Sequence, residues 1–168
     1  MKSIIEGING SLTVGVHIAD SVDLSIPYAI ANGYATVSRS TTGLEDSGYP
    51  QAWNMLSEWG IVVHSMGENS PTENTGATTL DAISTARFDG GSYGAASEFT
   101  LTEYGTDSSN TAYLAGKYAD YATRFPLLSF SVIRQQLRAN ASNGGTWTAI
   151  TGYGTPDWDA TETALSNL

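Results

Sequence analysis

An alternation of apolar and polar residues near the amino terminus constrains the fold most strongly. Apolar side chains occupy every second position over residues 11–18 and again over 22–30. Alternation with a period of two is typical of half-buried strands, and the short link 19–21 favours an antiparallel hairpin. Pro27 cannot donate a backbone hydrogen bond, which places the second strand at an edge of the sheet or bends the strand there.

Later segments carry weaker signals of both kinds. The sequence predicts further strands, each short and rich in Thr, Val, Ile or aromatic residues, at 34–40, 61–63, 97–104 and 146–151. Apolar and aromatic residues at helical spacing predict helices at 47–59, 111–123 and 126–137, and a terminal helix that begins after the capping residue Asp157 and runs through Leu165.

The expected fold class is α+β: a β-rich single domain of mostly antiparallel short strands with two to four short helices. The chain has 168 residues, of which 18 are Gly and only 14% are charged. That length suits one domain spanning 1–168, and that composition favours turns and short strands over long helices. The polar, Gly-containing segment 67–79 is expected to be an exposed loop.

The charge balance argues against two classes of partner. The chain has 7 basic and 17 acidic residues, for a net charge of −10. Phosphate-binding surfaces need clustered Lys and Arg, so direct nucleic-acid binding is not expected. Attraction to an anionic membrane surface is not expected for the same reason.

The chain contains no Cys, which removes disulfides and thiolate sites. No apolar run reaches the roughly 18 residues of a membrane span. The amino-terminal residues lack the apolar region of a cleaved signal peptide. The expected location is therefore a virion, or the extracellular space after release without a leader.

One segment matches the pattern of a catalytic nucleophile, G-x-S-x-G at residues 90–94. In hydrolases that use this pattern, a His follows the Ser in the chain. Both histidines, His17 and His64, precede Ser92. A glycine turn is the simpler interpretation.

Acidic pairs and the two histidines give little further chemistry. Three acidic pairs are spaced closely enough in sequence to suggest a glycosidase: Asp20 with Asp23, Glu45 with Asp46, and Asp157 with Asp159. Such pairs are common on solvated loops of an acidic chain. The histidines show no spacing typical of metal ligands. We expect no catalytic residue, no metal site and no cofactor.

The aromatic residues of the second half are the remaining signal. Tyr and Trp are enriched at protein interfaces because they combine a large apolar area with a polar group. The candidate interface residues are Tyr104, Tyr113, Tyr118, Tyr121, Trp147, Tyr153 and Trp158.

These observations predict a non-enzymatic structural subunit of a large assembly, such as a head-associated, neck or tail protein of a bacteriophage virion. Its partners would be copies of itself and other subunits of the assembly. One alternative is a leaderless secreted module that binds haem or a glycan, using His17 or His64 with a Tyr. A further alternative is a glycan hydrolase that uses paired carboxylates.

Overall fold

A computed structural model describes six stretches of the chain, at residues 2–14, 22–39, 61–66, 83–88, 98–148 and 150–168. The expected helix at 47–59 and the expected loop at 67–79 lie outside these stretches. The G-x-S-x-G segment at 90–94 lies outside them as well.

A parallel four-stranded sheet forms the centre of the described structure. Its spatial order is β1-β2-β3-β4, which is also the order along the chain. All three strand pairs are parallel, with Thr36 opposite Val62 and Val63 opposite Ile83. The strands are β1 (Thr36–Arg39), β2 (Val62–Met66), β3 (Ile83–Phe88) and β4 (Phe99–Leu101).

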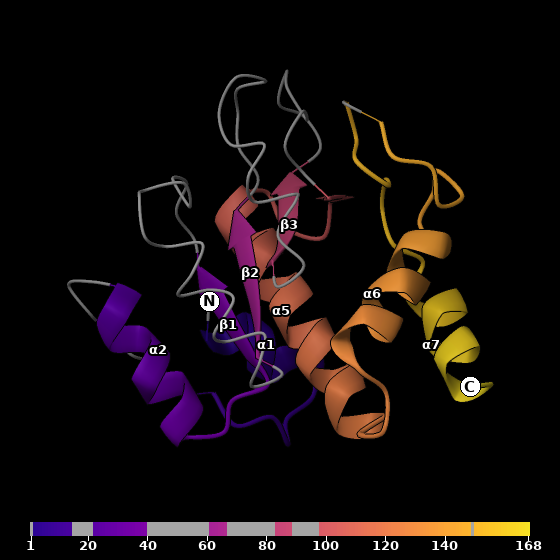
Figure 1. Cartoon of the computed structure of the whole chain (residues 1–168). Helices are drawn as coiled ribbons and strands as arrows, with labels where there is room; N and C mark the ends of the chain where they lie inside the picture. Colours follow the sequence, from indigo (N-terminus) through magenta and orange to yellow (C-terminus); the bar gives the residue numbers. More distant parts are fainter. Residues whose placement is uncertain (1, 15–21, 40–60, 67–82, 89–97, 149) are drawn as a thin grey trace.

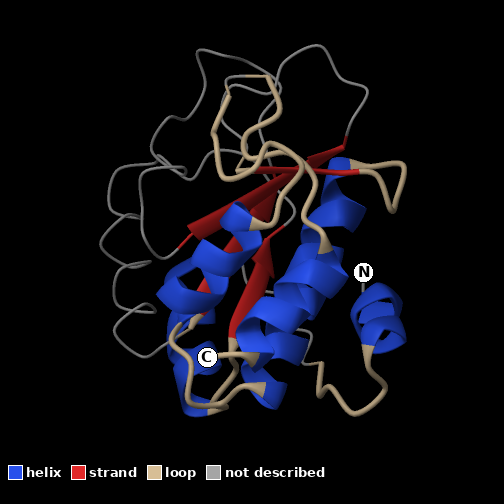
Figure 2. Cartoon of the chain, turned by 90° about the vertical axis from the view of Figure 1, so that its right-hand side faces the viewer, coloured by secondary structure: helices blue, strands red, loops and turns tan. Residues whose placement is uncertain are grey.

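In the described part of the chain, α1 and α5 lie behind this sheet in the view of Figure 1, α2 lies to its left, and α6 and α7 lie to its right. Their bounds are α1 (Lys2–Ile8), α2 (Val22–Ala31), α5 (Asp107–Arg124), α6 (Phe130–Ala139) and α7 (Trp158–Ser166). The 18-residue α5 packs against β1, β2 and β3 and also contacts α1 and α6. Figure 2 shows α1, marked by the amino terminus, beyond α5 at the edge of the molecule. No helix among these combines the length and the apolar character needed to cross a bilayer.

The hydrophobic core lies between α5, the sheet and the two carboxyl-terminal helices. Helix α5 contributes Leu114, Tyr118 and Tyr121, whose spacing of four and three residues puts them on one face. The other buried members of this cluster are Val62, Phe99, Leu101, Ile133, Leu137, Ala141 and Leu165. Because these residues come from β2, β4, α6 and α7 as well, α5 holds the sheet and the carboxyl-terminal helices together.

Close backbone approach lets α1 pack on the far side of α5. A Cβ atom at Gly116 would collide with Cδ1 of Ile8 and lie 3.3 Å from Cα of Ile5. A side-chain hydrogen bond adds to this contact, because Nδ2 of Asn9 donates to Oδ1 of Asp120 at 2.7 Å. The small residue at position 116 is therefore required by the packing of the two helices.

The expected β-rich, mostly antiparallel α+β class is wrong. The described strands are all parallel, and helices account for more of the described residues than strands do. The predicted hairpin fails at its second strand, since residues 22–31 form α2 with Pro27 inside the helix. Apolar residues at every second position of a helix fall on all of its sides, so the alternation does not identify the secondary structure here.

Other expected elements are confirmed in part. The segments 34–40, 61–63 and 97–104 contain β1, part of β2 and β4, and the helices predicted at 111–123 and 126–137 overlap α5 and α6. The terminal helix is confirmed as α7, and the carboxylate of Asp157 caps it by accepting a hydrogen bond from the N–H of Ala160 at 2.9 Å. Residues 146–151 do not form a strand; Thr148 makes only an isolated bridge to Gly152.

The Gly116 contact predicts that Gly116→Leu separates α1 from α5. The larger side chain would occupy the space of Ile8, and overpacking of this kind costs about 1–3 kcal/mol. The free energy of unfolding in urea should fall by that amount, and amide protons of residues 2–8 should exchange faster. Gly7→Ala is the matched control, because Gly7 is also helical and its Cβ would meet nothing within 4 Å. Equal stability of the two variants would contradict the packing.

The buried tyrosines predict a loss of stability at alkaline pH. Burial raises the pKa of Tyr118 and of Tyr121 well above the usual value of about 10. The unfolded chain would release these protons near pH 10 while the folded chain keeps them, so the free energy of unfolding should fall as the pH rises above about 10.

Ultraviolet absorbance of tyrosinate measures this directly. Of the nine tyrosines, Tyr118 and Tyr121 should ionise only when the protein unfolds, and Tyr118→Phe should remove one of these late ionisations. Ionisation of all nine near pH 10 in a protein that remains folded would contradict the burial.

Candidate active site

The amino terminus of α5 lies at the edge of the sheet where the strands end. Strand β4 ends at Leu101, and α5 begins at Asp107 after a short connection. Because the strands are parallel, their carboxyl ends share one edge, and Figure 1 shows α5 beginning at the end of the molecule toward which the strand arrows point. In open α/β folds, ligands bind outside the carboxyl ends of the strands.

Three hydroxyl groups lie at the start of α5. Thr106 is the N-cap residue, and its Oγ1 accepts a hydrogen bond from the N–H of Ser109 at 3.2 Å. The same hydroxyl donates to Oγ of Ser109 at 2.9 Å. Ser108 lies between the cap and Ser109 and is half-buried. The first backbone N–H groups of a helix have no intrahelical partner, and the helix dipole makes this end positive.

Asn110 fixes the connection that leads into α5. It is fully buried, and its side-chain amide makes two hydrogen bonds to the backbone of Tyr104. Its Oδ1 accepts from the N–H of Tyr104 at 3.0 Å, and its Nδ2 donates to the carbonyl of Tyr104 at 2.7 Å. The path of the chain before the first turn is therefore set by a buried side chain rather than by solvent-exposed contacts.

Aromatic rings lie beside this turn. The ring of Tyr113 lies 5.7 Å from that of Tyr104 and 5.6 Å from that of Trp158, edge to face with the latter. Nε1 of Trp158 donates to Glu103 at 2.9 Å, and Nζ of Lys117 lies 5.4 Å from the Trp158 ring centre. Burial, and next the charge of Glu103, raise the pKa of Tyr113.

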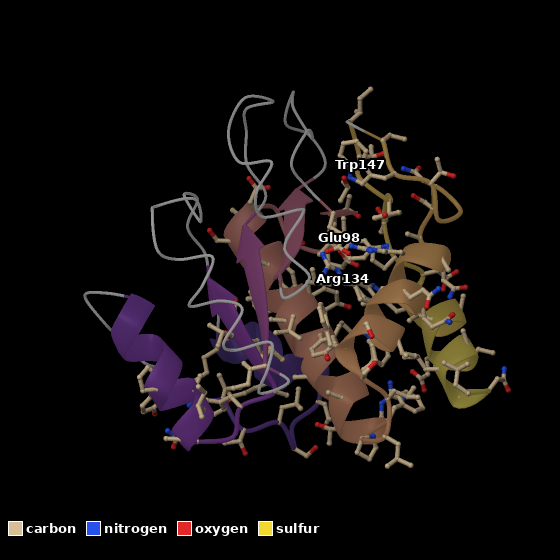
Figure 3. All side chains as sticks on the ribbon, in the orientation of Figure 1. Glu98, Arg134 and Trp147 are labelled. Atoms are coloured by element: carbon tan, nitrogen blue, oxygen red, sulfur yellow. The ribbon has the colours of Figure 1, made fainter. Side chains whose placement is uncertain are left out.

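A second polar cluster is buried where β4 begins. The carboxylate of Glu98 accepts from Nε and Nη2 of Arg134 at 2.8 and 3.0 Å, and from Nε of Arg138 at 2.7 Å. Glu98 is 2% exposed and Arg134 is 5% exposed. Figure 3 shows these two side chains next to each other.

The predicted site residues are spread over several parts of the fold. Tyr118 and Tyr121 are buried in the core, Tyr104, Tyr113 and Trp158 form the aromatic group beside α5, and Trp147 and Tyr153 lie near Glu98. His64 is on β2, opposite Ser38 and Ser84, while His17 lies outside the described residues. No group of three metal-ligating side chains occurs in the described stretches.

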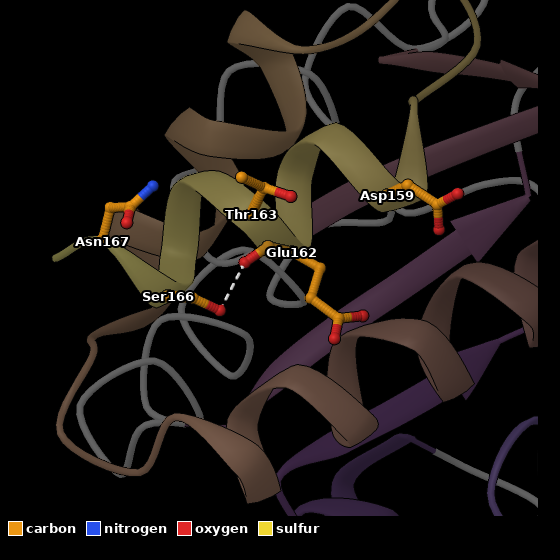
Figure 4. A pocket seen from close by; sticks show the side chains of 5 residues that line it. All are labelled: Asp159, Glu162, Thr163, Ser166 and Asn167. Carbon is orange, nitrogen blue, oxygen red and sulfur yellow. Dashed lines mark hydrogen bonds between the residues drawn. The ribbon is translucent and has the colours of Figure 1, made fainter.

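Of the three acidic pairs, only Asp157 with Asp159 has both side chains in the described part of the chain, and Asp20 of the pair Asp20–Asp23 lies outside it. Glu45 and Asp46 lie outside the described residues, and Asp157 is used as the cap of α7. Asp159 lines a groove of about 380 Å³ along α7, together with Glu162, Thr163, Ser166 and Asn167 (Figure 4). Glu162 forms a two-pronged ion pair with Arg124, whose hydrogen bond lowers the pKa of the Glu162 carboxyl.

Comparison with solved structures identifies the fold. The chain is similar to MycP1 from Mycobacterium smegmatis (TM-score 0.67, 15% identity, covering 82% of this chain and 52% of that one). It is similar to fervidolysin from Fervidobacterium pennivorans, a keratinolytic enzyme related to subtilisin (0.66, 17%, 83% and 28%). It is also similar to the prenylagaramide maturation protease PagA (0.65, 15%, 93% and 71%). The chain spans about half the length of MycP1. No family model matches the sequence, and no curated protein does.

These similarities correct the functional expectation. A structural subunit of a bacteriophage virion, acting without catalysis, is not what the fold indicates, because the similar structures include two proteases and a keratinolytic enzyme related to subtilisin. The expectation that the protein is not an enzyme is wrong on the same evidence. At 15–17% identity the similarity establishes the fold, an α/β architecture.

Sequence reasoning missed the start of α5 because it examined only one order of catalytic residues. It required a His after the Ser, which is the order in α/β-hydrolases. In subtilisin the order is Asp, His, Ser. His64 precedes Ser108 in this chain, and Asp20, Asp23 and Asp46 precede His64. The sequence therefore contains the subtilisin order, although the described residues do not assemble it.

The Glu98 cluster predicts an unequal cost for removing two acidic charges. Glu98→Gln would remove the charge of the carboxylate that pairs with the buried Arg134, and breaking a buried pair in this way costs about 3–5 kcal/mol. Glu162→Gln is the matched control, because it also removes a two-pronged partner of an Arg, but at an exposed site worth at most about 1 kcal/mol. Urea denaturation measures both. A smaller loss for Glu98→Gln than for Glu162→Gln would contradict the structure.

Proposed function

We propose that this chain is a serine peptidase domain of the subtilisin fold, with Ser108 as the nucleophile. The observation that carries the proposal is the position of Ser108. It lies in the first turn of α5, at the carboxyl edge of a parallel sheet, in a fold similar to that of solved proteases. Its substrate class is the peptide bond of a protein or peptide.

The helix terminus supports this chemistry through electrostatics. When Oγ of Ser108 attacks the carbonyl carbon of a peptide bond, negative charge develops on the carbonyl oxygen. Unpaired backbone N–H groups and the positive end of a helix dipole stabilise such charge. Asn110 supports the geometry, since its two hydrogen bonds to Tyr104 fix the chain that enters the turn.

A histidine must take the proton of the attacking hydroxyl. The chain has two, His17 and His64, and both precede Ser108 as the subtilisin order requires. We favour His64, because β2 ends two residues after it at the same edge of the sheet. The histidine would pass the proton to the leaving amine as the acyl-enzyme forms, and water would then release the acid product and regenerate the hydroxyl.

The hydrogen bonds that cap α5 favour Ser108 rather than Ser109 as the nucleophile. The Ser109 side chain takes part in the cap through Thr106, and its N–H is also used there. A hydroxyl that completes a cap contributes to the stability of the helix, by about 1 kcal/mol. The use of Ser109 in the cap favours Ser108, the other serine of this turn, as the nucleophile.

Hydrolysis of fluorescently labelled casein tests the proposal. The wild-type chain should cleave it, and Ser108→Ala should reduce kcat/KM by at least about 10³-fold, because loss of a nucleophile removes covalent catalysis. Ser109→Ala is the matched control and should retain activity within about threefold. A wild-type chain that cannot cleave casein, or a Ser108→Ala variant that cleaves it normally, would overturn the proposal.

His64→Ala and His17→Ala complete the experiment. The first should lower kcat/KM as strongly as Ser108→Ala, and the second should have little effect. The reverse result would assign the proton transfer to His17, and full activity of both variants would exclude a histidine base.

A further inference from the structure

Three Asn-Gly pairs lie in the described part of the chain, at residues 9–10, 32–33 and 143–144. In such a pair the backbone nitrogen of the glycine can attack the side-chain amide of the asparagine, because glycine has no Cβ to obstruct the approach. The succinimide ring that forms opens with water to aspartate or isoaspartate. The hydrogen bonds around the three pairs differ, and they determine which asparagine can react.

The side-chain amide of Asn143 and the nitrogen that would attack it are both held. Nδ2 of Asn143 donates to Oγ1 of Thr151 at 2.9 Å and to the carbonyl of Gly152 at 3.0 Å. The N–H of Gly144 donates to the carbonyl of Ala141 at 2.8 Å. Attack would break all three hydrogen bonds, so the folded structure opposes the reaction at this pair.

Asn32 is protected in a similar way at the end of α2. Its Nδ2 donates to the carbonyl of Tyr28 at 2.8 Å, and the N–H of Gly33 donates to the carbonyl of Ile30 at 3.1 Å. Gly33 also has a positive φ of 63°, in the turn that ends the helix. The nitrogen needed for attack is therefore engaged in a hydrogen bond here as well.

Asn9 differs, because its side-chain carbonyl is polarised and the neighbouring nitrogen is not engaged. Oδ1 of Asn9 accepts hydrogen bonds from the N–H and from the hydroxyl of Ser11, at 3.0 and 2.7 Å. Two such donors stabilise the negative charge that this oxygen gains when a nucleophile adds to Cγ. Among the described residues, none accepts a hydrogen bond from the N–H of Gly10. Gly10 and Ser11 are exposed, so water reaches the pair.

The same asparagine, which directly follows α1, joins that helix to α5. Its Nδ2 donates to Oδ1 of Asp120 at 2.7 Å. In both segments this bond lies about one helical turn further along the chain than the contact of Ile5 with Gly116. Asp120 is 8% exposed, and its other carboxylate oxygen pairs with Arg124 at 3.0 Å. An amide donor at position 9 therefore suits this carboxylate, whereas a second carboxylate would repel it.

We propose that Asn9 is a site of spontaneous deamidation, and that this reaction weakens the contact between α1 and α5. The backbone nitrogen of Gly10 loses its proton to water and bonds to Cγ of Asn9, and Nδ2 takes up a proton and leaves as ammonia. Water then adds to one carbonyl of the succinimide, and the ring opens to aspartate or isoaspartate. One water is consumed and one ammonia is released. The inference does not depend on the assignment of Ser108.

Incubation of the full chain at mildly alkaline pH, followed by mass spectrometry of chymotryptic peptides, tests the proposal. In the folded protein Asn9 should deamidate at least about tenfold faster than Asn32 or Asn143, because donors placed on a developing oxyanion change rates by that much or more. In urea the three rates should become similar, since the hydrogen bonds that distinguish the pairs are lost. A folded protein in which Asn9 reacts no faster than the other two, or an equal preference for Asn9 in urea, would overturn the proposal.

Two variants examine the groups that act on Asn9. Ser11→Ala removes the hydroxyl donor and should slow deamidation of Asn9 by about threefold to tenfold, the rate equivalent of one neutral hydrogen bond. Gly10→Ala should slow it further, because a methyl group obstructs the attacking nitrogen, and a Cβ there meets nothing within 4 Å that would disturb the fold. The rates at Asn32 and Asn143 are the internal controls and should not change. An unchanged rate at Asn9 in both variants would contradict the mechanism.

Asn9→Asp reproduces the product and tests its consequence. Amide protons of residues 2–8 should exchange faster in this variant than in the wild-type chain. Asn32→Asp is the matched control, because it makes the same change of charge where the amide faces a carbonyl rather than a carboxylate, and it should leave that exchange unchanged. Combining Asn9→Asp with Asp120→Asn interchanges the two groups and should restore part of the protection. Wild-type exchange in Asn9→Asp, or no recovery in the combined variant, would contradict the repulsion between the two carboxylates.

Discussion

Helix α5 buries nine of its eighteen residues and contacts the sheet, α1 and α6 at once. Its core face, Leu114, Tyr118 and Tyr121, lies in one cluster with residues of β2, β4, α6 and α7. Gly116 makes room for α1 beside this face. Because so many elements contact this one helix, its direction fixes which end of the sheet its amino terminus approaches. That end is the carboxyl edge of the strands, where the candidate active site lies.

The chain just before and just after β4 is held by hydrogen bonds of buried polar side chains, in addition to apolar packing. Asn110 fixes the chain after β4 through the backbone of Tyr104, and Glu98 fixes the chain before it through two arginines. A buried polar group left without a partner is costly, so such groups define one arrangement of the chain. The candidate site at Ser108 adjoins the bonded group of Asn110.

The carboxyl-terminal helices could be predicted from sequence because their signals are local. Asp157 caps α7 through its own side chain, and the apolar spacing of Ile133 and Leu137 marks α6. The parallel sheet could not be predicted from sequence in the same way. Buried parallel strands are usually continuous apolar runs, whereas β1 reads Thr-Val-Ser-Arg and β3 contains Ser84, Thr85 and Arg87. Pairing between these strands depends on contacts far apart in the chain, which no local pattern records.

The candidate nucleophile was hidden for a related reason. Ser108 stands in a run of small polar residues, and only the position of α5 distinguishes it from the chain's other serines. The aromatic residues expected to form an assembly surface are divided between the core, the surroundings of the first turn of α5 and the neighbourhood of Glu98. Whether the protein associates with itself or with other subunits remains a prediction.

The most direct measurement is reaction of the folded chain with a fluorophosphonate, followed by mass spectrometric identification of the modified residue. Such reagents modify a serine whose hydroxyl is activated for attack. The account predicts one adduct, on Ser108, that disappears when the protein is unfolded before reaction. No adduct, or an adduct on another serine such as Ser92, would contradict the assignment of the active site to the first turn of α5.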